Sequence, residues 1–323
     1  MKVETITALP GDLSADNKNV YVFPATNYDQ DFYARRTDRN IGWISKKEQE
    51  MLRNATVGMA GVGGIGGSVS MVLVQSGIGN LKLADLEPFD VGNISRQFGA
   101  TQGTVGMPKV EAVTRELRRI SEDINLTLYP SGITEETIDH FLDGCDIVLD
   151  GIDLWAIGAR MLLMQRARER GITVMNCATI GFGSRIFLFT PDGVSLEERL
   201  GMNYEQAKAF EARVDAGQVT PEERSKFIQA LANALVPELP SYAPPDAEAG
   251  HMNAILKRLV ETGTAAGWAL SGWLSCSFAA NQIVYYLLRD SGVPRHVVTP
   301  PPVPGYLYLD VGFMVAKAVE GKP

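Results

Sequence analysis

The chain has 323 residues, of which 45% are hydrophobic and 21% charged, a composition that excludes a chain disordered throughout. Its formal net charge of -8 at pH 7 would repel a polyanion over most of the surface, which argues against a nucleic-acid partner. No apolar run approaches the roughly 18 residues of a membrane span, and the N-terminus has polar residues where a signal peptide needs an apolar core. We therefore expect a cytoplasmic protein without membrane association.

The first predicted elements follow an irregular, polar arm over residues 1–38. Ser45 followed three residues later by Glu48 is a capping-box signature, which predicts a helix running through Leu52. Beyond it, strands and helices alternate. Strands are predicted over 55–61, 80–85, 124–130, 145–151, 173–178 and 184–191, and helices over 68–76, 109–120, 135–142 and 153–170. This alternation predicts an α/β fold with a doubly wound, mainly parallel, Rossmann-like sheet.

After Pro191 the pattern changes to acid-leaning helices over 204–214 and 221–235, followed by a stretch with four prolines over 237–245. A long apolar helix from 265 to 288 and a strand over 306–310 then return to the core. The predicted organisation is an N-terminal arm and helix (1–50), a core (51–191), a helical crossover insertion (192–262), and a returning helix with the final strand of the core (263–323).

A glycine-rich turn links the first core strand to the next helix. Its glycines are Gly61, Gly63, Gly64 and Gly66. Backbone N–H groups of such a turn, together with the helix dipole, can hold a phosphate group. The pattern is shared by proteins that bind NAD, FAD and ATP, so by itself it indicates a nucleotide without specifying which one.

Two acids stand where the second core strand ends, Asp85 at its tip and Glu87 two residues later. Dinucleotide enzymes place an acid roughly 20 residues past the glycine turn to bind the ribose hydroxyls. Either acid fits that position.

The loop after the second core strand, and the start of the helix that follows it, indicate which nucleotide is bound. Arg96 and Lys109 supply two cations, and Asn93 and Gln97 supply two amides beside the phosphate-binding turn. Hydride transfer does not need these groups, whereas phosphoryl chemistry needs fixed positive charge on the phosphate oxygens. Lys109 is informative because a cation is disfavoured at a helix N-terminus. The arrangement favours ATP.

Asp150 and Asp153 follow a buried strand, at the sheet edge where open α/β folds bind ligands. Mg²⁺ takes one or two carboxylates together with phosphate oxygens, so we predict Asp153 as the Mg²⁺ ligand. The same residue also fits the N-cap of the helix expected after it.

The ordered set GxGGxG, acidic pair, NxxRQ, GxPK and DGxD resembles the ThiF/MoeB/HesA superfamily, relatives of ubiquitin-activating enzymes, over roughly residues 39–190. The resemblance implies that Glu87 holds the ATP ribose while Asp85 supports the turn. It also implies that Arg96 and Lys109 neutralise the triphosphate, with Asn93 and Gln97 assisting. The chain departs from the family at Leu154, where an Asn often stands.

By the same resemblance the protein is an ATP-dependent adenylyltransferase that joins a carboxylate to AMP and releases pyrophosphate. The substrate would be the C-terminus of a ubiquitin-like carrier protein, a peptide or a small carboxylic acid. The family also implies a homodimer in which Arg39 reaches the γ-phosphate of the neighbouring subunit, although Arg39 is equally consistent with a plain surface residue.

Three alternatives stay open. A tRNA-modifying dehydratase of the same fold conflicts with the acidic charge, and an NAD(P)-dependent oxidoreductase leaves Arg96, Gln97 and Lys109 without a role. A non-catalytic partner subunit conflicts with the presence of both cations. Many relatives carry a catalytic cysteine or a CxxC zinc pair. Here Cys145, Cys177 and Cys276 are isolated, and Cys177 is the sole candidate for a nucleophile, because it is expected near the nucleotide.

Overall fold

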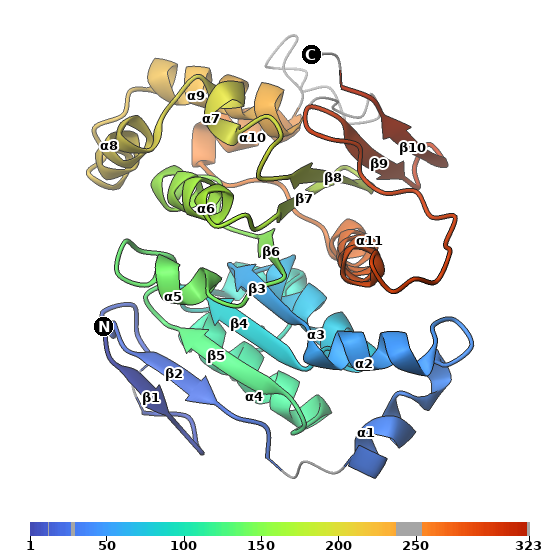
Figure 1. Ribbon diagram of the computed structural model, residues 1–323. Helices are drawn as coiled ribbons and strands as arrows, with labels where there is room; N and C mark the ends of the chain where they lie inside the picture. Colours follow the sequence, from blue (N-terminus) through green and yellow to red (C-terminus); the bar gives the residue numbers. More distant parts are fainter. Residues whose placement is uncertain (12, 27–29, 237–253, 322–323) are drawn as a thin grey trace.

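The computed structural model describes the whole chain except residues 12, 27–29, 237–253 and 322–323. In this described part of the chain, ten strands form one mixed sheet in the order β1-β2-β5-β4-β3-β6-β7-β8-β9-β10 (Figure 1). The strands are β1 (Val3–Thr5), β2 (Val20–Phe23), β3 (Thr56–Ala60), β4 (Asn80–Ala84), β5 (Asn125–Tyr129), β6 (Ile147–Asp150), β7 (Val174–Ile180), β8 (Gly183–Phe189), β9 (Tyr306–Asp310) and β10 (Val315–Val319).

The centre of the sheet is parallel, from β5 through β4, β3 and β6 to β7, and β8, β9 and β10 continue it antiparallel. The expected α/β fold with a mainly parallel sheet is confirmed. Ala60 at the end of β3 pairs with both Ala84 and Asp150. The turns after β3, β4 and β6 therefore meet at one edge of the sheet, where open α/β folds collect ligands.

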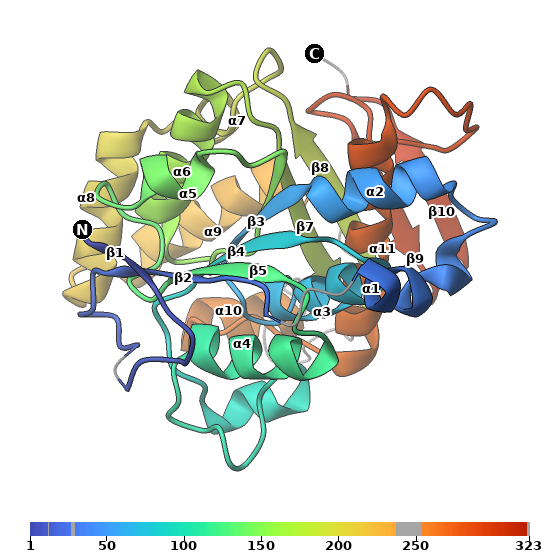
Figure 2. The ribbon, with the colours of Figure 1, turned by 60° about the horizontal axis from the view of Figure 1, so that its bottom comes forward.

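Helices cover both faces of the sheet, and Figure 2 shows α3 and α4 on one side with α6 on the other. The helical segments are α1 (Gln30–Arg36), η1 (Asp38–Asn40), α2 (Lys46–Asn54), α3 (Gly66–Ser76), η2 (Val91–Ser95), α4 (Lys109–Ile120), α5 (Ile138–Leu142), α6 (Ile157–Glu169), α7 (Leu196–Leu200), α8 (Tyr204–Asp215), α9 (Pro221–Leu235), α10 (Ala254–Thr262) and α11 (Ala269–Leu288). Across the described parts of the chain, none of them is long and apolar enough to cross a bilayer.

Two apolar clusters fill the space between the sheet and these helices. Leu149 of β6 belongs to the cluster that includes side chains of α2, α3, α4 and α11, while its neighbour Val148 belongs to the cluster on the opposite face, with side chains of α5, α6 and α9. Side chains alternate between the faces of a strand, so a central strand buried on both sides reads as a continuous apolar run. That is why the run before Asp150 was recognisable in the sequence.

Several sequence expectations need correction. The arm is not irregular throughout, since β1 and β2 extend the sheet and β2 pairs antiparallel with β5. Strands of three or four residues are too short to show an alternating pattern, and tertiary pairing stabilises them. The last long helix begins at Ala269, after an extended segment over 263–268, and β10 adds an edge strand that was not predicted. The proline-rich stretch 237–245 lies outside the described residues.

A buried ion pair fastens the start of α2 to the segment that follows α11. The carboxylate of Glu48 is fully buried and accepts hydrogen bonds from Arg295 Nη2 at 2.7 Å, from the Ser45 backbone N–H at 2.8 Å and from Ser291 Oγ at 3.1 Å. Burial acts to raise the pKa of Glu48, but these donors outweigh it and lower the pKa to about 2. The folded state therefore favours the ionised carboxylate.

Glu48→Gln is expected to lower the free energy of unfolding at pH 7 by about 3 kcal/mol, because it leaves the Arg295 guanidinium without its buried anion. A carboxyl whose pKa falls from 4.5 to about 2 on folding contributes stability that is complete above pH 4.5 and lost as the pH falls toward 2. Urea denaturation at several pH values should thus show a shallower acid-side slope for Glu48→Gln. The matched control is Glu50→Gln, because the Glu50 side chain is 56% exposed on the same helix. Equal effects of both substitutions would contradict the assignment.

Candidate nucleotide site

The glycine turn after β3 contains two glycines that the packing of the chain requires. A Cβ on Gly61 would lie 2.3 Å from the Gly151 carbonyl oxygen, and Gly61 has a φ of +94°. A Cβ on Gly66 would lie 1.9 Å from the Gly61 carbonyl oxygen. Both contacts are with backbone, which cannot move aside. Gly61 lets the turns after β3 and β6 touch, and Gly66 lets the start of α3 fold back against Gly61.

Gly63 and Gly64 have a different reason to be glycine. Among the described residues, a Cβ on Gly63 would come no closer than 3.7 Å to another residue's side chain, and one on Gly64 no closer than 4.0 Å. Packing within the chain therefore does not require glycine at either position. They lie directly before α3, whose first turn has neither an acidic residue nor a side-chain cap within the described structure. The turn thus presents an open backbone and an uncompensated helix dipole, which suit an anion.

The Gln97 side chain faces this open side of the turn. Its amide group is the one nearest to a Cβ built on Gly63, its Cγ atom is the one nearest to a Cβ on Gly64, and its Oε1 atom is buried without a hydrogen-bond partner among the described residues. A buried, unpaired polar atom costs about 1–3 kcal/mol, so this position calls for a partner, either a water molecule or a polar group of a ligand. Rotation of the amide by half a turn would present its N–H₂ group as a donor to phosphate.

The two acids after β4 have separate roles in the structure. Asp85 Oδ2 accepts a hydrogen bond from the Val62 N–H, and its Oδ1 accepts one from the Glu87 N–H, both at 2.9 Å. Burial raises the pKa of Asp85, and the charge of Lys109 opposes this shift. Asp85 therefore ties the end of β4 to the glycine turn, whereas the Glu87 side chain is 52% exposed.

Lys109, at the start of α4, lies beside these acids. Its side chain is 6% exposed, and its Nζ atom is 2.5 Å from Glu87 Oε2. Its backbone N–H also donates to the Glu87 carbonyl oxygen at 2.9 Å. The structure thus brings together the predicted ribose ligand and one of the two predicted cations.

Arg96 and Asn93 belong to the η2 loop. Arg96 Nη1 donates to the Gly92 carbonyl oxygen at 2.9 Å, and a Cβ on Gly267 would lie 2.9 Å from Arg96 Nε. Gly267, in the segment before α11, therefore lies against the Arg96 side chain. Asn93 Oδ1 accepts a hydrogen bond from the Asp90 N–H at 3.0 Å, so this side chain shapes the loop that carries Arg96.

Asp153 is exposed in the turn after β6, and its Oδ1 accepts a hydrogen bond from the Trp155 N–H at 3.0 Å. Because α6 begins only at Ile157 with Ala156 as its N-cap, the alternative reading of Asp153 as the helix cap is wrong. The described residues contain no group of three metal-binding side chains. Asp153 is therefore a single carboxylate at the edge of the sheet.

Sequence reasoning missed the partners of Asp150. This carboxylate is buried and receives Arg160 Nε at 2.9 Å and Asn176 Nδ2 at 2.7 Å. An acid at the end of a buried strand needs such partners, so the position of Asp150 was a signal that they exist. Which residues they are depends on how α6 and β7 pack beside β6.

The structure does not bring Arg39 to the other candidate residues. Arg39 is exposed, and its neighbour Asn40 donates to the Ser76 carbonyl oxygen at the C-terminal end of α3. A helix of 11 residues spans about 16 Å, and the glycine turn lies at the other end of α3. Within one chain, Arg39 is thus a helix length away from the site.

All three cysteines of the sequence are free and buried. Burial raises the pKa of Cys177 to about 11 and those of Cys145 and Cys276 to about 12. The thiolate is the nucleophilic form, and these thiols are protonated near pH 7. The environment of Cys177 therefore does not favour a nucleophile.

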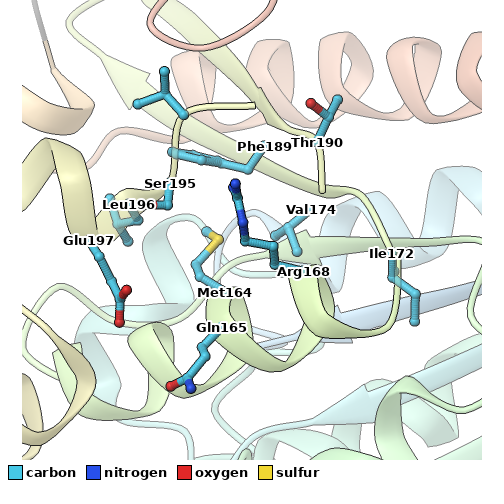
Figure 3. A pocket seen from close by; sticks show the side chains of 11 residues that line it. Met164, Gln165, Arg168, Ile172, Val174, Phe189, Thr190, Ser195, Leu196 and Glu197 are labelled. Carbon is cyan, nitrogen blue, oxygen red and sulfur yellow. The ribbon is translucent and has the colours of Figure 1, made fainter. Parts of the chain in front are cut away.

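A separate, small cavity lies where the C-terminal half of α6 meets the start of β7 and the end of β8 (Figure 3). Its walls include Met164, Val174 and Phe189, and Arg168 on its rim donates to the Gly193 carbonyl oxygen at 2.6 Å. It is at the opposite end of β7 from the glycine turn. It therefore takes no part in the candidate site.

Comparison with known proteins gives matches over the same region. The sequence profile of the ThiF family matches residues 37–239. A tRNA threonylcarbamoyladenosine dehydratase of Bacillus subtilis is 34% identical over 139 residues, which are 43% of this chain and 54% of that protein. A molybdopterin-synthase adenylyltransferase of Salmonella typhimurium is 30% identical over 142 residues, 44% of this chain and 56% of that protein. The chain thus spans about half the length of these curated relatives.

Among solved structures, Escherichia coli MccB shares the fold. Its structure with ATP has a TM-score of 0.58 and 16% sequence identity, covering 96% of this chain and 73% of MccB. Its structure with AMPCPP and MccA has a TM-score of 0.57 at the same identity and coverage.

The two kinds of glycine make a matched pair for substitution. Gly66→Ala is expected to lower the free energy of unfolding by about 3 kcal/mol, because its Cβ collides with backbone. Gly63→Ala should leave it within about 0.5 kcal/mol of the wild-type value, since its Cβ would make only an ordinary van der Waals contact with Gln97. Urea denaturation measures both. Similar losses of stability at the two positions would contradict the division between packing and ligand-facing glycines.

Proposed function

This chain belongs to the ThiF family, and from that premise we propose that it is an ATP-dependent adenylyltransferase. It would join a carboxylate to the α-phosphate of ATP, giving an acyl-AMP and pyrophosphate. The observation that carries the proposal is the glycine turn, where Gly63 and Gly64 leave an open backbone beside the unsatisfied Gln97 amide. Phosphate at an uncapped helix N-terminus fits that arrangement.

The neighbouring residues take roles that suit adenylation. Glu87 would hydrogen-bond the ribose hydroxyls, while Asp85 holds the turn through its bonds to two backbone N–H groups. Lys109 and Arg96 would neutralise charge on the triphosphate as it redistributes in the transition state. The attacking carboxylate is already ionised at pH 7, so the site needs alignment and positive charge, and no general base.

Asp153 would hold Mg²⁺ at the sheet edge. Mg²⁺ keeps several water ligands and takes one or two protein carboxylates together with phosphate oxygens, so a single exposed carboxylate beside a phosphate-binding turn fits it. When bound, the ion would screen charge on the triphosphate and fix its orientation.

The substrate we propose is the C-terminus of a ubiquitin-like carrier or of a peptide, or a small carboxylic acid, selected by the insertion 192–262. The structure of MccB with MccA and AMPCPP supports a site of this fold that accommodates a partner and a nucleotide together. We also propose a homodimer in which Arg39 acts on the neighbouring subunit's nucleotide. Its distance from its own glycine turn supports this, as do Trp268, Leu270 and Trp273, which are 42–64% exposed on and beside α11.

Pyrophosphate exchange is the direct test of adenylation. In the presence of the carboxylate substrate, Lys109→Ala and Asp153→Ala should each reduce the exchange rate at least about 100-fold, because each removes charge that stabilises the transition state. Arg119→Ala is the control, since the Arg119 side chain is 76% exposed at the other end of α4, outside the insertion. Exchange that survives both site substitutions at the wild-type rate would refute the proposed function.

A tRNA-modifying dehydratase is the second candidate, because one of the most similar curated relatives carries that activity in its name. The net charge of -8 opposes it. Bulk tRNA in a gel-shift assay at physiological salt is therefore expected not to shift, since binding to a polyanion needs cations against phosphate. Binding that weakens steeply as salt rises would favour the dehydratase instead.

A further inference from the structure

Helix α6 begins just after the turn that carries Asp153, and it lacks a cap of its own. Its N-cap residue, Ala156, has no side-chain acceptor, and no acid stands in its first turn. The first N–H groups of a helix need acceptors, and the positive end of its dipole favours a negative charge. Another part of the chain therefore has to supply the acceptor atoms and the negative charge.

Glu211 of α8, in the insertion, supplies that charge. Its Oε2 atom accepts hydrogen bonds from the Gly158 N–H at 2.6 Å and from the Ala159 N–H at 3.3 Å. A Cβ on Gly158 would lie 2.5 Å from this oxygen and 3.1 Å from Lys208 Cα. Glycine at this position therefore lets the two helices approach until the carboxylate reaches the α6 backbone.

Arg160, the residue after Ala159 in α6, connects the start of this helix to the turn that carries Asp153. Arg160 Nε pairs with Asp150 Oδ2 at 2.9 Å, and Arg160 Nη2 donates to the Ile152 carbonyl oxygen. Arg160 therefore binds the residues on either side of Gly151, which are Asp150 and Ile152. The Gly151 carbonyl oxygen in turn packs against Gly61 of the glycine turn. One guanidinium group holds the turn between β6 and Asp153.

The first half of α8 makes a second contact, with the residues before α5. Tyr204 Oη donates to Glu135 Oε1 at 2.8 Å, and Lys208 Nζ lies 2.6 Å from the same oxygen. Helix α8 is thus held at two points, one before α5 and one at the start of α6. The Glu211 contact is the one that joins α8 to the backbone at the start of α6.

We propose that Glu211 and Arg160 are positioning residues, through which the insertion sets the location of Asp153 and hence the affinity for Mg·ATP. The inference rests on the proposed function, because it assigns Asp153 to Mg²⁺. Helix α8 would thereby connect the insertion, which is proposed to select the acyl substrate, with the nucleotide site. Residues that orient a metal ligand without touching the metal commonly change the metal affinity when they are substituted. The proposed link needs an effect of this kind.

Two measurements on the full chain test the link. The first is amide hydrogen exchange of residues 150–160 without nucleotide, which reports the turn directly. The second is Mg·ATP affinity by isothermal titration calorimetry. Glu211→Ala should accelerate exchange in this segment and raise the Kd for Mg·ATP about tenfold. Glu211→Gln keeps the shape of the side chain and one acceptor oxygen, so it should give an intermediate effect. This variant also tests the link if the alanine substitution loosens the insertion as a whole.

Glu205→Ala is the matched control, because Glu205 is an exposed acid on the same helix. It should leave both exchange and Kd at their wild-type values. Wild-type exchange over 150–160 in both Glu211 variants would overturn the inference. If the wild-type protein does not bind Mg·ATP, the proposed function fails by itself, and the exchange data alone then decide whether α8 positions the turn.

Discussion

The site depends on a close contact between two backbone turns at the carboxyl edge of the sheet. Gly61 after β3 and Gly151 after β6 approach so closely that a Cβ on Gly61 would overlap the Gly151 carbonyl oxygen. The contact exists because β3 and β6 are adjacent, parallel and in register, with Ala60 opposite Asp150. It places the phosphate-binding turn and the turn carrying Asp153 side by side, which no local sequence preference could do.

Around this contact, the acids divide into those that build the site and those available for chemistry. Asp85 and Asp150 are occupied by backbone N–H groups, Arg160 and Asn176, so their charge is used within the fold. Glu87 and Asp153 are exposed at the same edge. Buried carboxylates with full sets of donors rigidify a site, and exposed ones can bind a ligand. The proposed ribose and Mg²⁺ roles fall on this exposed pair, of which Glu87 also lies 2.5 Å from Lys109 Nζ.

The insertion is part of the site's support. It contributes Glu211 to the start of α6, and the residues that end it pass beside the site on both sides. Trp155 Nε1 donates to the Gly263 carbonyl oxygen at 2.5 Å, and the chain at Gly267 lies against Arg96. The segment 263–268 therefore contacts both the turn after β6, through Trp155, and the loop that carries Arg96. We therefore expect an acyl substrate that contacts the insertion to affect both the turn that carries Asp153 and the loop that carries Arg96.

The sequence by itself determined the fold class, the glycine turn and the helix start at Lys109, because these follow from local periodicity, capping and backbone conformation. It also ordered the candidate residues along the chain correctly at the ends of β3, β4 and β6. It did not determine β1, β2 or β10, which are too short or too exposed to carry a pattern. Tertiary structure alone decided that Glu87 pairs with Lys109, that Arg160 holds Asp150 and that Glu211 caps α6. Each of these joins residues from 10 to 53 positions apart through the packing of separate elements, and sequence spacing does not encode which side chains then meet.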